Sequence, residues 1–376
     1  MIYLDNAATT LEKPPSVARA VSHAISHYAS PGRGGYPAAM QAGEIMYQCR
    51  ELASNMFDVP NLEQVILTAS ATHGLNIAIR TLVEPGSTVL ISGYEHNAVT
   101  RSLHAIPEVT VQVVNAPLFD ADGAFTAFEH MLTDDIDVVI YNHVSNVFGF
   151  IQPMDRIARL CRERNKPLVV DAAQSAGMIP VSLAGWGAAF IAMPGHKGLY
   201  GPQGTGLLLC GTEPKPILYG GTGSLSMQQE MPDFLPDRLE AGTQNVCGVA
   251  GLLAGMRHVQ LVGVESIERK ERGLCRRMMD LLAQIPGVRI FRGAEAQSGL
   301  FSFLIDGKDC EAVSAQLGDA GVAVRAGLHC APLAHKTAGT LESGTVRASF
   351  SMFNRPDQIE RAADLICAIA KNKRAS

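Results

Sequence analysis

Residues 194–206 read Pro194-Gly195-His196-Lys197-Gly198-Leu199-Tyr200-Gly201-Pro202-Gln203-Gly204-Thr205-Gly206. The apolar run 188–193 precedes this stretch and the run 207–210 follows it, so the pattern predicts a glycine-rich loop between two short buried strands. The loop carries one lysine. Burial against apolar walls lowers the pKa of an amine, and such an amine can attack a carbonyl and form a Schiff base. A hairpin whose lysine points into water fits the same residues, so other parts of the chain must decide.

A second motif lies upstream, where a predicted strand meets its loop. The apolar residues 168–170 lead directly to Asp171. Ligands of open α/β sheets bind at the carboxyl ends of the strands, although a single strand-end aspartate is more often a helix cap. Together, Lys197 and Asp171 fit a site for pyridoxal 5'-phosphate, in which lysine holds the aldehyde and aspartate pairs with the pyridinium nitrogen.

Four motifs give the chain a family resemblance that extends from Tyr3 to Phe350. They are Tyr3-Leu4-Asp5-Asn6-Ala7-Ala8, Asp171-Ala172-Ala173-Gln174, Gly195-His196-Lys197 and Arg325-Ala326-Gly327-Leu328-His329-Cys330-Ala331. The chain resembles the class V aminotransferase family of pyridoxal phosphate enzymes, and most closely the cysteine desulfurases and selenocysteine lyases. The resemblance implies an α/β protein with the fold type I pyridoxal phosphate transferase fold. That fold has a large domain with a mostly parallel seven-stranded sheet and a smaller α+β C-terminal domain.

Composition restricts the partners and the compartment. The net charge of −5 argues against a nucleic-acid surface or an anionic membrane as a partner. No apolar run reaches the roughly 18 residues of a membrane span, and Met1 leads directly into a strand-like segment, so we expect no membrane helix and no signal peptide. The eight cysteines include no Cys-x-x-Cys pair, which favours reduced thiols in a cytoplasmic protein over disulfides or a metal site.

Strand signals recur near residues 65, 88, 111, 138, 168, 188 and 206, and helical stretches separate several of them. This alternation predicts a mostly parallel sheet that is covered on both faces. We expect three parts: an N-terminal arm (1–15) that packs with the small domain, a large cofactor-binding domain (16–255) and a small C-terminal domain (256–376). A helix is predicted over 38–56, with Glu44 and Arg50 pointing outward.

The smaller domain has its own predicted elements. Apolar patterns indicate strands over 288–291, 300–305, 322–325 and 346–350, and helices over 310–319 and 356–371.

The residues that would hold the cofactor follow from the resemblance. The strand 65–68 leads into a predicted helix start, whose free N–H groups suit a phosphate, although an ordinary N-cap fits the same residues. The resemblance implies that Ala71, Thr72 and His196 hold the phosphate. It also implies that His96 stacks on the ring and shuttles protons, and that Asn146 and Gln174 contact the phenolic oxygen of the ring. Thr243 would reach the phosphate of a neighbouring subunit, which implies a homodimer.

Two residues of the C-terminal part carry the chemistry that this resemblance implies. Cys330 lies in a polar loop next to His329, and a thiolate beside cationic groups is a competent nucleophile. It matches the persulfide-forming cysteine of the desulfurases, whereas the other seven cysteines are expected to be buried fillers. Arg347 matches the arginine that binds the substrate carboxylate, a role in which its two parallel N–H groups form a clamp. Asn6 and Arg325 are further substrate-binding candidates.

The chain departs from the family pattern at two positions. Members commonly carry a serine before Gly-His-Lys, where this chain has Pro194, and often a second threonine where it has Ala71. Proline has no N–H or hydroxyl to donate to a phosphate. Cofactor binding is therefore expected to depend more on Thr72, His196 and Thr243 of the partner.

The sequence thus predicts a cysteine desulfurase that converts L-cysteine to L-alanine and transfers the sulfur to Cys330 as a persulfide. Arg347 would hold the carboxylate, Lys197 would act as the base, and a sulfur-acceptor protein would take the product sulfur. The alternatives are a selenocysteine lyase, an aminotransferase or epimerase of the same family, and a sulfur-relay binding protein with weak catalysis. The intact set of Lys197, Asp171, Cys330 and Arg347 argues against the last.

Overall fold

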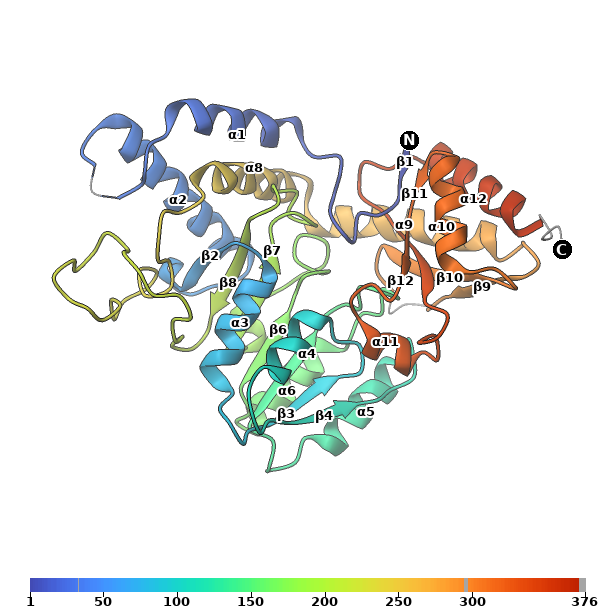
Figure 1. Cartoon of the computed structure of the whole chain (residues 1–376), viewed down its shortest axis with the longest axis horizontal. Helices are drawn as coiled ribbons and strands as arrows, with labels where there is room; N and C mark the ends of the chain where they lie inside the picture. Colours follow the sequence, from blue (N-terminus) through green and yellow to red (C-terminus); the bar gives the residue numbers. More distant parts are fainter. Residues whose placement is uncertain (33, 294–296, 372–376) are drawn as a thin grey trace.

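The structure is a computed structural model that describes residues 1–32, 34–293 and 297–371. A large part is built on a seven-stranded sheet and a smaller part on a four-stranded sheet (Figure 1). The chain starts beside the smaller part, builds the large part, and then returns through the long helix α9 (Val264–Leu282). The N-terminal arm and the C-terminal third therefore lie together although they are far apart in sequence.

The large sheet has the predicted strands. Its order is β2-β8-β7-β6-β5-β3-β4; β8 runs antiparallel to both of its neighbours and the other pairs are parallel. The strands are β2 (Val65–Thr68), β3 (Thr88–Ser92), β4 (Thr110–Val114), β5 (Val138–Asn142), β6 (Leu168–Asp171), β7 (Phe190–Pro194) and β8 (Gly206–Cys210). The prediction of a mostly parallel seven-stranded sheet is confirmed.

Helices cover both faces of this sheet, and alternate residues of each strand point to opposite faces. Val138 and Ile140 of β5 pack with α3 and α4, whereas Val139 and Tyr141 pack with α2, α5, α6 and α8. Helix α1 lies along α8, outside these layers (Figure 1). The helical elements of the large part are α1 (Pro15–His27), α2 (Pro37–Met56), the 3-10 turn η1 (Leu62–Gln64), α3 (Ala71–Leu82), α4 (Asn97–His104), α5 (Ala121–Met131), α6 (Met154–Glu163), α7 (Leu183–Trp186) and α8 (Val246–Val262).

The smaller part has an antiparallel sheet in the order β12-β13-β10-β9 and its own apolar core. Its strands are β9 (Val288–Phe291), β10 (Leu300–Ile305), β12 (Arg325–Gly327) and β13 (Thr345–Ser349), and its helices, besides α9, are α10 (Cys310–Asp319), α11 (Pro332–Thr337) and α12 (Pro356–Lys371). The predicted bounds of α10 and α12 are confirmed.

The prediction of one strand over 322–325 is wrong in one respect, because in the structure this segment contributes to two different sheets. Its first half is β11 (Val322–Ala323), which pairs in parallel with β1 (Ile2–Tyr3) of the arm, and its second half begins β12. Apolar periodicity marks extended residues but carries no information about which strand pairs with them. The arm is thus tied to the smaller part by β1 and by Leu4, which lies in the core of that part.

Between the two parts the chain turns at Gly263, which separates α8 from α9 and has φ of +85°. The division into residues 1–15, 16–255 and 256–376 places its boundary in α8 and remains a proposal. Within the described residues, no single helix is long and apolar enough to cross a membrane; the pair α8–α9, bent by 83°, could do so by length and composition only.

The position of the Arg50 side chain contradicts the prediction made from the sequence. It was expected to point outward from α2, but its side chain is 8% exposed and pairs with Glu240 at 2.6 Å. Glu240 belongs to the irregular segment 211–245, and its other carboxylate oxygen accepts the N–H of Leu67 on the edge strand β2 (2.7 Å). An edge strand has unpaired N–H groups, and the Glu240 carboxylate accepts one of them on β2. Arg50 is buried because it is the counter-ion of this carboxylate.

We expect Glu240→Gln to lower the stability of the protein, because it leaves the buried Arg50 guanidinium without a counter-ion. Removing one partner of a buried ion pair costs about 3–5 kcal/mol. Glu84→Gln is the matched control, because it breaks the exposed pair with Lys215 (71% and 60% exposed), which is worth about 0–1 kcal/mol. Urea unfolding measures the free energy of unfolding of both variants. Equal decreases in the two variants would contradict this account of Arg50.

Candidate active site

A pocket of about 210 Å³ lies at the carboxyl ends of β5, β6 and β7, against the start of α3. Such an edge is where ligands of α/β sheets bind. The pocket brings together most of the cofactor-site residues predicted from the sequence: Ala71, Thr72, His96, Asn146, Asp171, Gln174, His196 and Lys197. The predicted residues that do not line it are Asn6, Thr243, Arg325, Cys330 and Arg347.

Lys197 follows β7 in the tight turn that begins at Gly195. Burial lowers the pKa of its ammonium group to about 8, although the nearby Asp171 carboxylate opposes this shift. Asp171 is the last residue of β6 and is 5% exposed, and its Oδ1 accepts the N–H of Ala173 (2.9 Å). The pocket thus combines an amine that loses its proton near pH 8 with a carboxylate that is held in place.

The end of the pocket formed by α3 offers backbone donors. Ser70 caps the helix, since its Oγ accepts the N–H of His73 (3.1 Å), and the first turn of a helix leaves its N–H groups free for an anion. At Gly74, an added Cβ would lie only 3.3 Å from the side chain of Ala192, so glycine lets α3 pack closely on the sheet. Pro194 lines the same pocket and adds no donor, as the sequence predicts.

His96 is the N-cap of α4 and lines the pocket. Its Nδ1 accepts the N–H of Ala98 (3.0 Å), and burial lowers the pKa of the ring, although Asp171 opposes the shift. A neutral ring whose Nδ1 is an acceptor carries its proton on Nε2. His96 therefore has one N–H available for the pocket.

Glu95 was missed by the sequence reasoning, because nothing in its surroundings there distinguishes it from a loop residue. It is fully buried, and its Oε1 lies 2.5 Å from Ser92 Oγ and 2.7 Å from the N–H of Asn142. Ser92 Oγ also lies 2.9 Å from Asn142 Oδ1, and one hydroxyl hydrogen cannot serve two acceptors. A proton on Glu95 satisfies both contacts. Consistently, burial and then the Asp171 charge raise the pKa of Glu95 to about 8.

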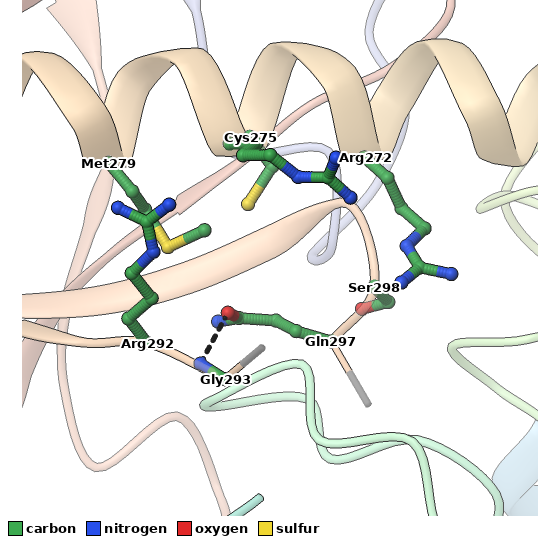
Figure 2. A pocket seen from close by; sticks show the side chains of 8 residues that line it. Arg272, Cys275, Met279, Arg292, Gly293, Gln297 and Ser298 are labelled. Carbon is green, nitrogen blue, oxygen red and sulfur yellow. Dashed lines mark hydrogen bonds between the residues drawn. The ribbon is translucent and has the colours of Figure 1, made fainter. Parts of the chain in front are cut away.

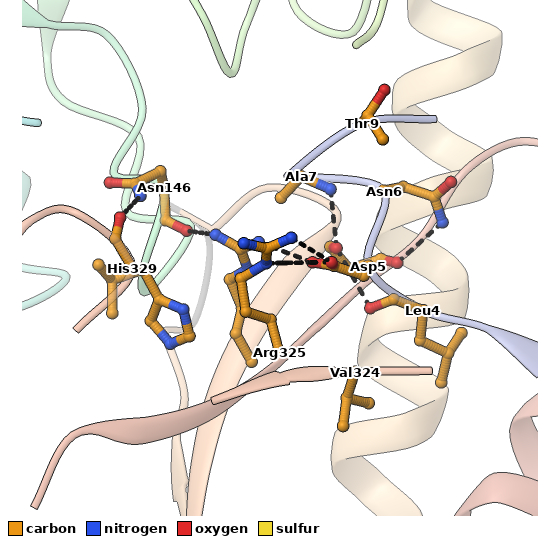
Figure 3. A network of polar contacts seen from close by, with 12 residues as sticks. Leu4, Asp5, Asn6, Ala7, Thr9, Asn146, Val324, Arg325 and His329 are labelled. Atoms are coloured by element: carbon orange, nitrogen blue, oxygen red, sulfur yellow. Dashed lines mark hydrogen bonds and ion pairs between the residues drawn. The ribbon is translucent and has the colours of Figure 1, made fainter. Parts of the chain in front are cut away.

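Arg347 does not line the pocket but pairs with Asp5 of the N-terminal arm, in a buried polar network of which Figure 3 shows Asp5, Arg325 and Asn146. It is 3% exposed at its side chain; Nη1 donates to the backbone oxygen of Asn146 (2.8 Å) and Nη2 to Asp5 Oδ1 (2.9 Å). Arg325, 52% exposed, pairs with the other oxygen of Asp5 at 3.0 Å. Asn6 donates its amide to the backbone oxygen of Ser349 (3.0 Å), which ties the arm to β13.

Cys330 is exposed, as the sequence reasoning expects of a nucleophile, and all eight cysteines are free. Its backbone oxygen accepts the N–H of Asn97 (2.7 Å), so the Cys330 loop is attached to the start of α4. Cys49, Cys161, Cys210, Cys275 and Cys310 are buried, which confirms them as core residues, whereas Cys247 and Cys367 are partly exposed.

The cationic neighbour that the sequence reasoning expected for Cys330 is not His329. Burial, and then the Arg347 charge, lower the pKa of His329 to about 2, so this ring is neutral at physiological pH. The carbonyl of His329 accepts the amide of Asn146 (2.7 Å), which links the Cys330 loop to a pocket residue. The Arg325 guanidinium lies close enough to Cys330 for the two groups to interact electrostatically.

The pocket residues fit pyridoxal phosphate. Asn146 Oδ1 is buried and has no hydrogen-bond partner among the described residues, so an acceptor is left for a ring hydroxyl. His196 also lines the pocket, and its Nδ1 likewise has no partner among the described residues. Gln174 uses Nε2 to hold the arm through the backbone oxygen of Ala7 (3.0 Å).

A second pocket, of about 270 Å³, lies in the smaller part between α9 and the chain that follows β9 (Figure 2). Arg272, Arg276 and Arg292 line it, but Arg272 pairs with Glu268 and Arg292 with Asp280. None of the residues predicted for the active site lines this pocket.

Comparison with known proteins identifies the family. The family profile described as aminotransferase class-V matches residues 2–362. The chain belongs to this family. It is 31% identical to a probable cysteine desulfurase of Methanothermobacter thermautotrophicus, covering 98% of this chain and 94% of that protein. It is 32% identical to a probable cysteine desulfurase of Mycolicibacterium paratuberculosis, of which it spans 54%.

Solved structures confirm the fold type I fold. The cysteine desulfurase of Thermococcus onnurineus superposes with a TM-score of 0.90 at 28% identity, covering 98% of this chain and 94% of that one. The cysteine desulfurase CsdA of Escherichia coli gives 0.86 at 27% identity, with coverage of 98% and 94%. Membership of the class-V family implies a pyridoxal phosphate cofactor.

The lowered pKa of Lys197 makes uptake of the cofactor by the apoprotein depend on pH. The neutral amine attacks the aldehyde, and its fraction rises as pH increases through about 8. We expect the rate at which the visible absorbance of bound pyridoxal phosphate appears to rise with a midpoint near pH 8. Lys197→Ala should not develop this absorbance, and a midpoint near 10.5 would contradict the burial of the amine.

The raised pKa of Glu95 predicts how stability depends on pH. The folded protein binds this proton up to about pH 8 but the unfolded chain releases it near 4.5, so the contribution of Glu95 is present below 4.5 and is lost as pH rises toward 8. Glu95→Gln removes the titration. Relative to the variant, the wild type should lose about 1.4 kcal/mol per pH unit within this window. Urea unfolding at pH 5, 6.5 and 8 measures the difference, and a constant difference would contradict a protonated Glu95.

Proposed function

We propose that this chain is a pyridoxal phosphate-dependent cysteine desulfurase, which converts L-cysteine to L-alanine and transfers the sulfur to Cys330 as a persulfide. The observation that carries the proposal is the position of Cys330. It is the exposed cysteine of the chain, and its loop is bonded to the helix of His96 and, through His329, to Asn146. A nucleophilic thiol is thereby attached to a pocket that contains Lys197 and Asp171.

Different residues of the pocket would contact different parts of the cofactor. The start of α3, with Ala71 and Thr72, and His196 would hold the phosphate. Asp171 would pair with the ring nitrogen, Asn146 and Gln174 would contact the ring oxygen, His96 would stack on the ring, and Lys197 would bind the aldehyde. When bound, the cofactor supplies an electron sink for the bonds at the substrate α-carbon.

The chain's own residues then perform the remaining tasks. Arg347 binds the substrate carboxylate, with Asn6 and Arg325 positioning this side of the site. Lys197, neutral above about pH 8 because of burial, takes the α-proton, and His96 holds a proton on Nε2 for the substrate. The Cys330 thiolate forms an S–S bond to the substrate sulfur as the C–S bond breaks. The β-carbon keeps the electron pair and gains a proton, Lys197 returns the proton to the α-carbon, and the product is alanine.

A homodimer and a sulfur-acceptor protein complete the proposal. Thr243 is exposed and is absent from the pocket of its own chain, which supports a role in the site of a neighbouring copy. Leu218, Tyr219 and Met227 of the same segment are 53%, 76% and 98% exposed, an apolar surface that a second copy can cover. An exposed Cys330 can pass its sulfur to another protein, and free cysteines favour a cytoplasmic location.

The decisive test mixes the purified holoenzyme with L-cysteine and measures alanine and sulfide in the presence of a reductant. We expect Cys330→Ala to lose at least about 100-fold in alanine formation and to keep the absorbance of the bound cofactor. Cys247→Ala, a partly exposed cysteine in α8, is the matched control and should keep its activity.

Other results would redirect the proposal. Bound cofactor without alanine from the wild type would contradict the desulfurase and lead to L-selenocysteine and other amino acids as substrates. Full activity in Cys330→Ala would contradict the role of Cys330.

A further inference from the structure

The network around Asp5 carries an inference that rests on the proposed role of Arg347 and deepens it. Asp5 lies between two guanidinium groups (Figure 3): its Oδ1 contacts Nη2 of Arg347 (2.9 Å) and, at a longer distance, Nε of Arg325 (3.3 Å), whereas its Oδ2 contacts Nη2 of Arg325 (3.0 Å). An arginine proposed to bind the carboxylate of a substrate is thus already paired with a carboxylate of its own chain.

Arg347 needs a counter-ion whether or not a substrate is bound. Its side chain is 3% exposed, and an unpaired charge at such a depth is strongly unfavourable. The carbonyl of Asn146 accepts from Nη1 but brings no charge. Within the described part of the chain, Asp5 is the acidic group that forms an ion pair with Arg347.

Asp5 fills only half of the available binding edge. The Nε and Nη2 atoms of an arginine form one edge of the guanidinium plane, which a carboxylate can bind with two parallel hydrogen bonds. Asp5 occupies Nη2, whereas Nε is buried and has no hydrogen-bond partner among the described residues. A ligand carboxylate that takes the whole edge must replace Asp5 at Nη2, and it also satisfies Nε.

Asp5 can release Arg347 without becoming unpaired. Arg325 contacts it through both Nε (3.0 Å) and Nη2 (3.0 Å), and this arginine is half exposed, so the remaining pair is partly solvated. The backbone of Asp5 is fixed independently, because the arm bridges to Ser349 and the N–H of Ala7 donates to Ser349 Oγ (2.8 Å).

We propose that Asp5 is the resident counter-ion of Arg347 and that the substrate carboxylate displaces it from Arg347 onto Arg325. The exchange keeps two carboxylates on two arginines when a substrate is bound. An amide or ester of the substrate brings no charge and cannot complete it. Asp5 therefore makes the site selective for ligands with a free carboxylate and sets the affinity for them through competition.

Asp5→Asn tests the proposal in the holoenzyme. Dissociation constants of L-alanine and L-alaninamide are measured by titration of the thermal unfolding midpoint. Without the competing carboxylate, we expect L-alanine to bind about tenfold more tightly and L-alaninamide to change less than twofold. Tyr3→Phe is the matched control, because it removes the contacts of the Tyr3 hydroxyl with the backbone oxygens of Thr9 (2.9 Å) and Asp5 (3.3 Å) and leaves the Asp5 carboxylate and both guanidinium groups in place; it should leave both constants unchanged.

A second variant keeps the test decisive if Asp5→Asn does not fold. Arg325→Gln leaves Asp5 with Arg347 as its partner, so L-alanine should bind several-fold more weakly and L-alaninamide should be unaffected. Opposite changes in the two variants are the signature of the exchange. Weaker binding of L-alanine to Asp5→Asn, or equal changes for both ligands in either variant, would overturn it.

The desulfurase assay on the wild type separates this proposal from the proposed function. Absence of alanine from L-cysteine would contradict the function, whereas the preference for L-alanine over L-alaninamide in the variants would still decide the role of Asp5. Alanine formation together with an unchanged preference in Asp5→Asn would contradict the role of Asp5 alone.

Discussion

The register of three neighbouring parallel strands is the constraint on which the site depends. Asn142 at the end of β5 lies opposite Asp171 at the end of β6, and Asp171 lies opposite Ala192 of β7, just before the loop of Lys197. Hydrogen bonding between the strands therefore sets the separation of carboxylate and amine, which come from distant parts of the sequence. A shift of one residue would turn Asp171 toward the opposite face of the sheet.

Burial at this edge then determines which groups carry charge. Asp171 and Glu95 lie close enough that their charges interact: burial first, and then the Asp171 charge, raise the pKa of Glu95, so Glu95 keeps its proton beside the Asp171 carboxylate. Burial also lowers the pKa values of Lys197, His96 and His196, so both histidine rings are neutral at pH 8, where about half of the Lys197 amine has lost its proton. An acid or base transfers protons efficiently when its pKa lies near the working pH, and the Lys197 amine meets this condition.

Much of the fold was predictable, because apolar periodicity reports burial directly. The strands of the large sheet, and the helices α10 and α12, follow from patterns within single segments. The same reasoning failed where a distant partner decides the outcome. Arg50 is buried because Glu240 reaches it from another segment, and the extended run 322–325 divides between β1 and β13 as partners. His329 is adjacent to Cys330 in sequence, but its burial beside Arg347 makes it neutral.

The sequence by itself determined the residue types of the site and their order: a lysine in a glycine-rich turn, an aspartate at a strand end, and a cysteine in a polar loop. Motifs carry this information because each chemical role needs a particular side chain in a particular local backbone. Only the tertiary structure decided the charge states of His329 and Glu95 and the attachment of Asp5 to Arg347 and Arg325. Ion pairing and desolvation act through space, between segments that the chain brings together only when it folds.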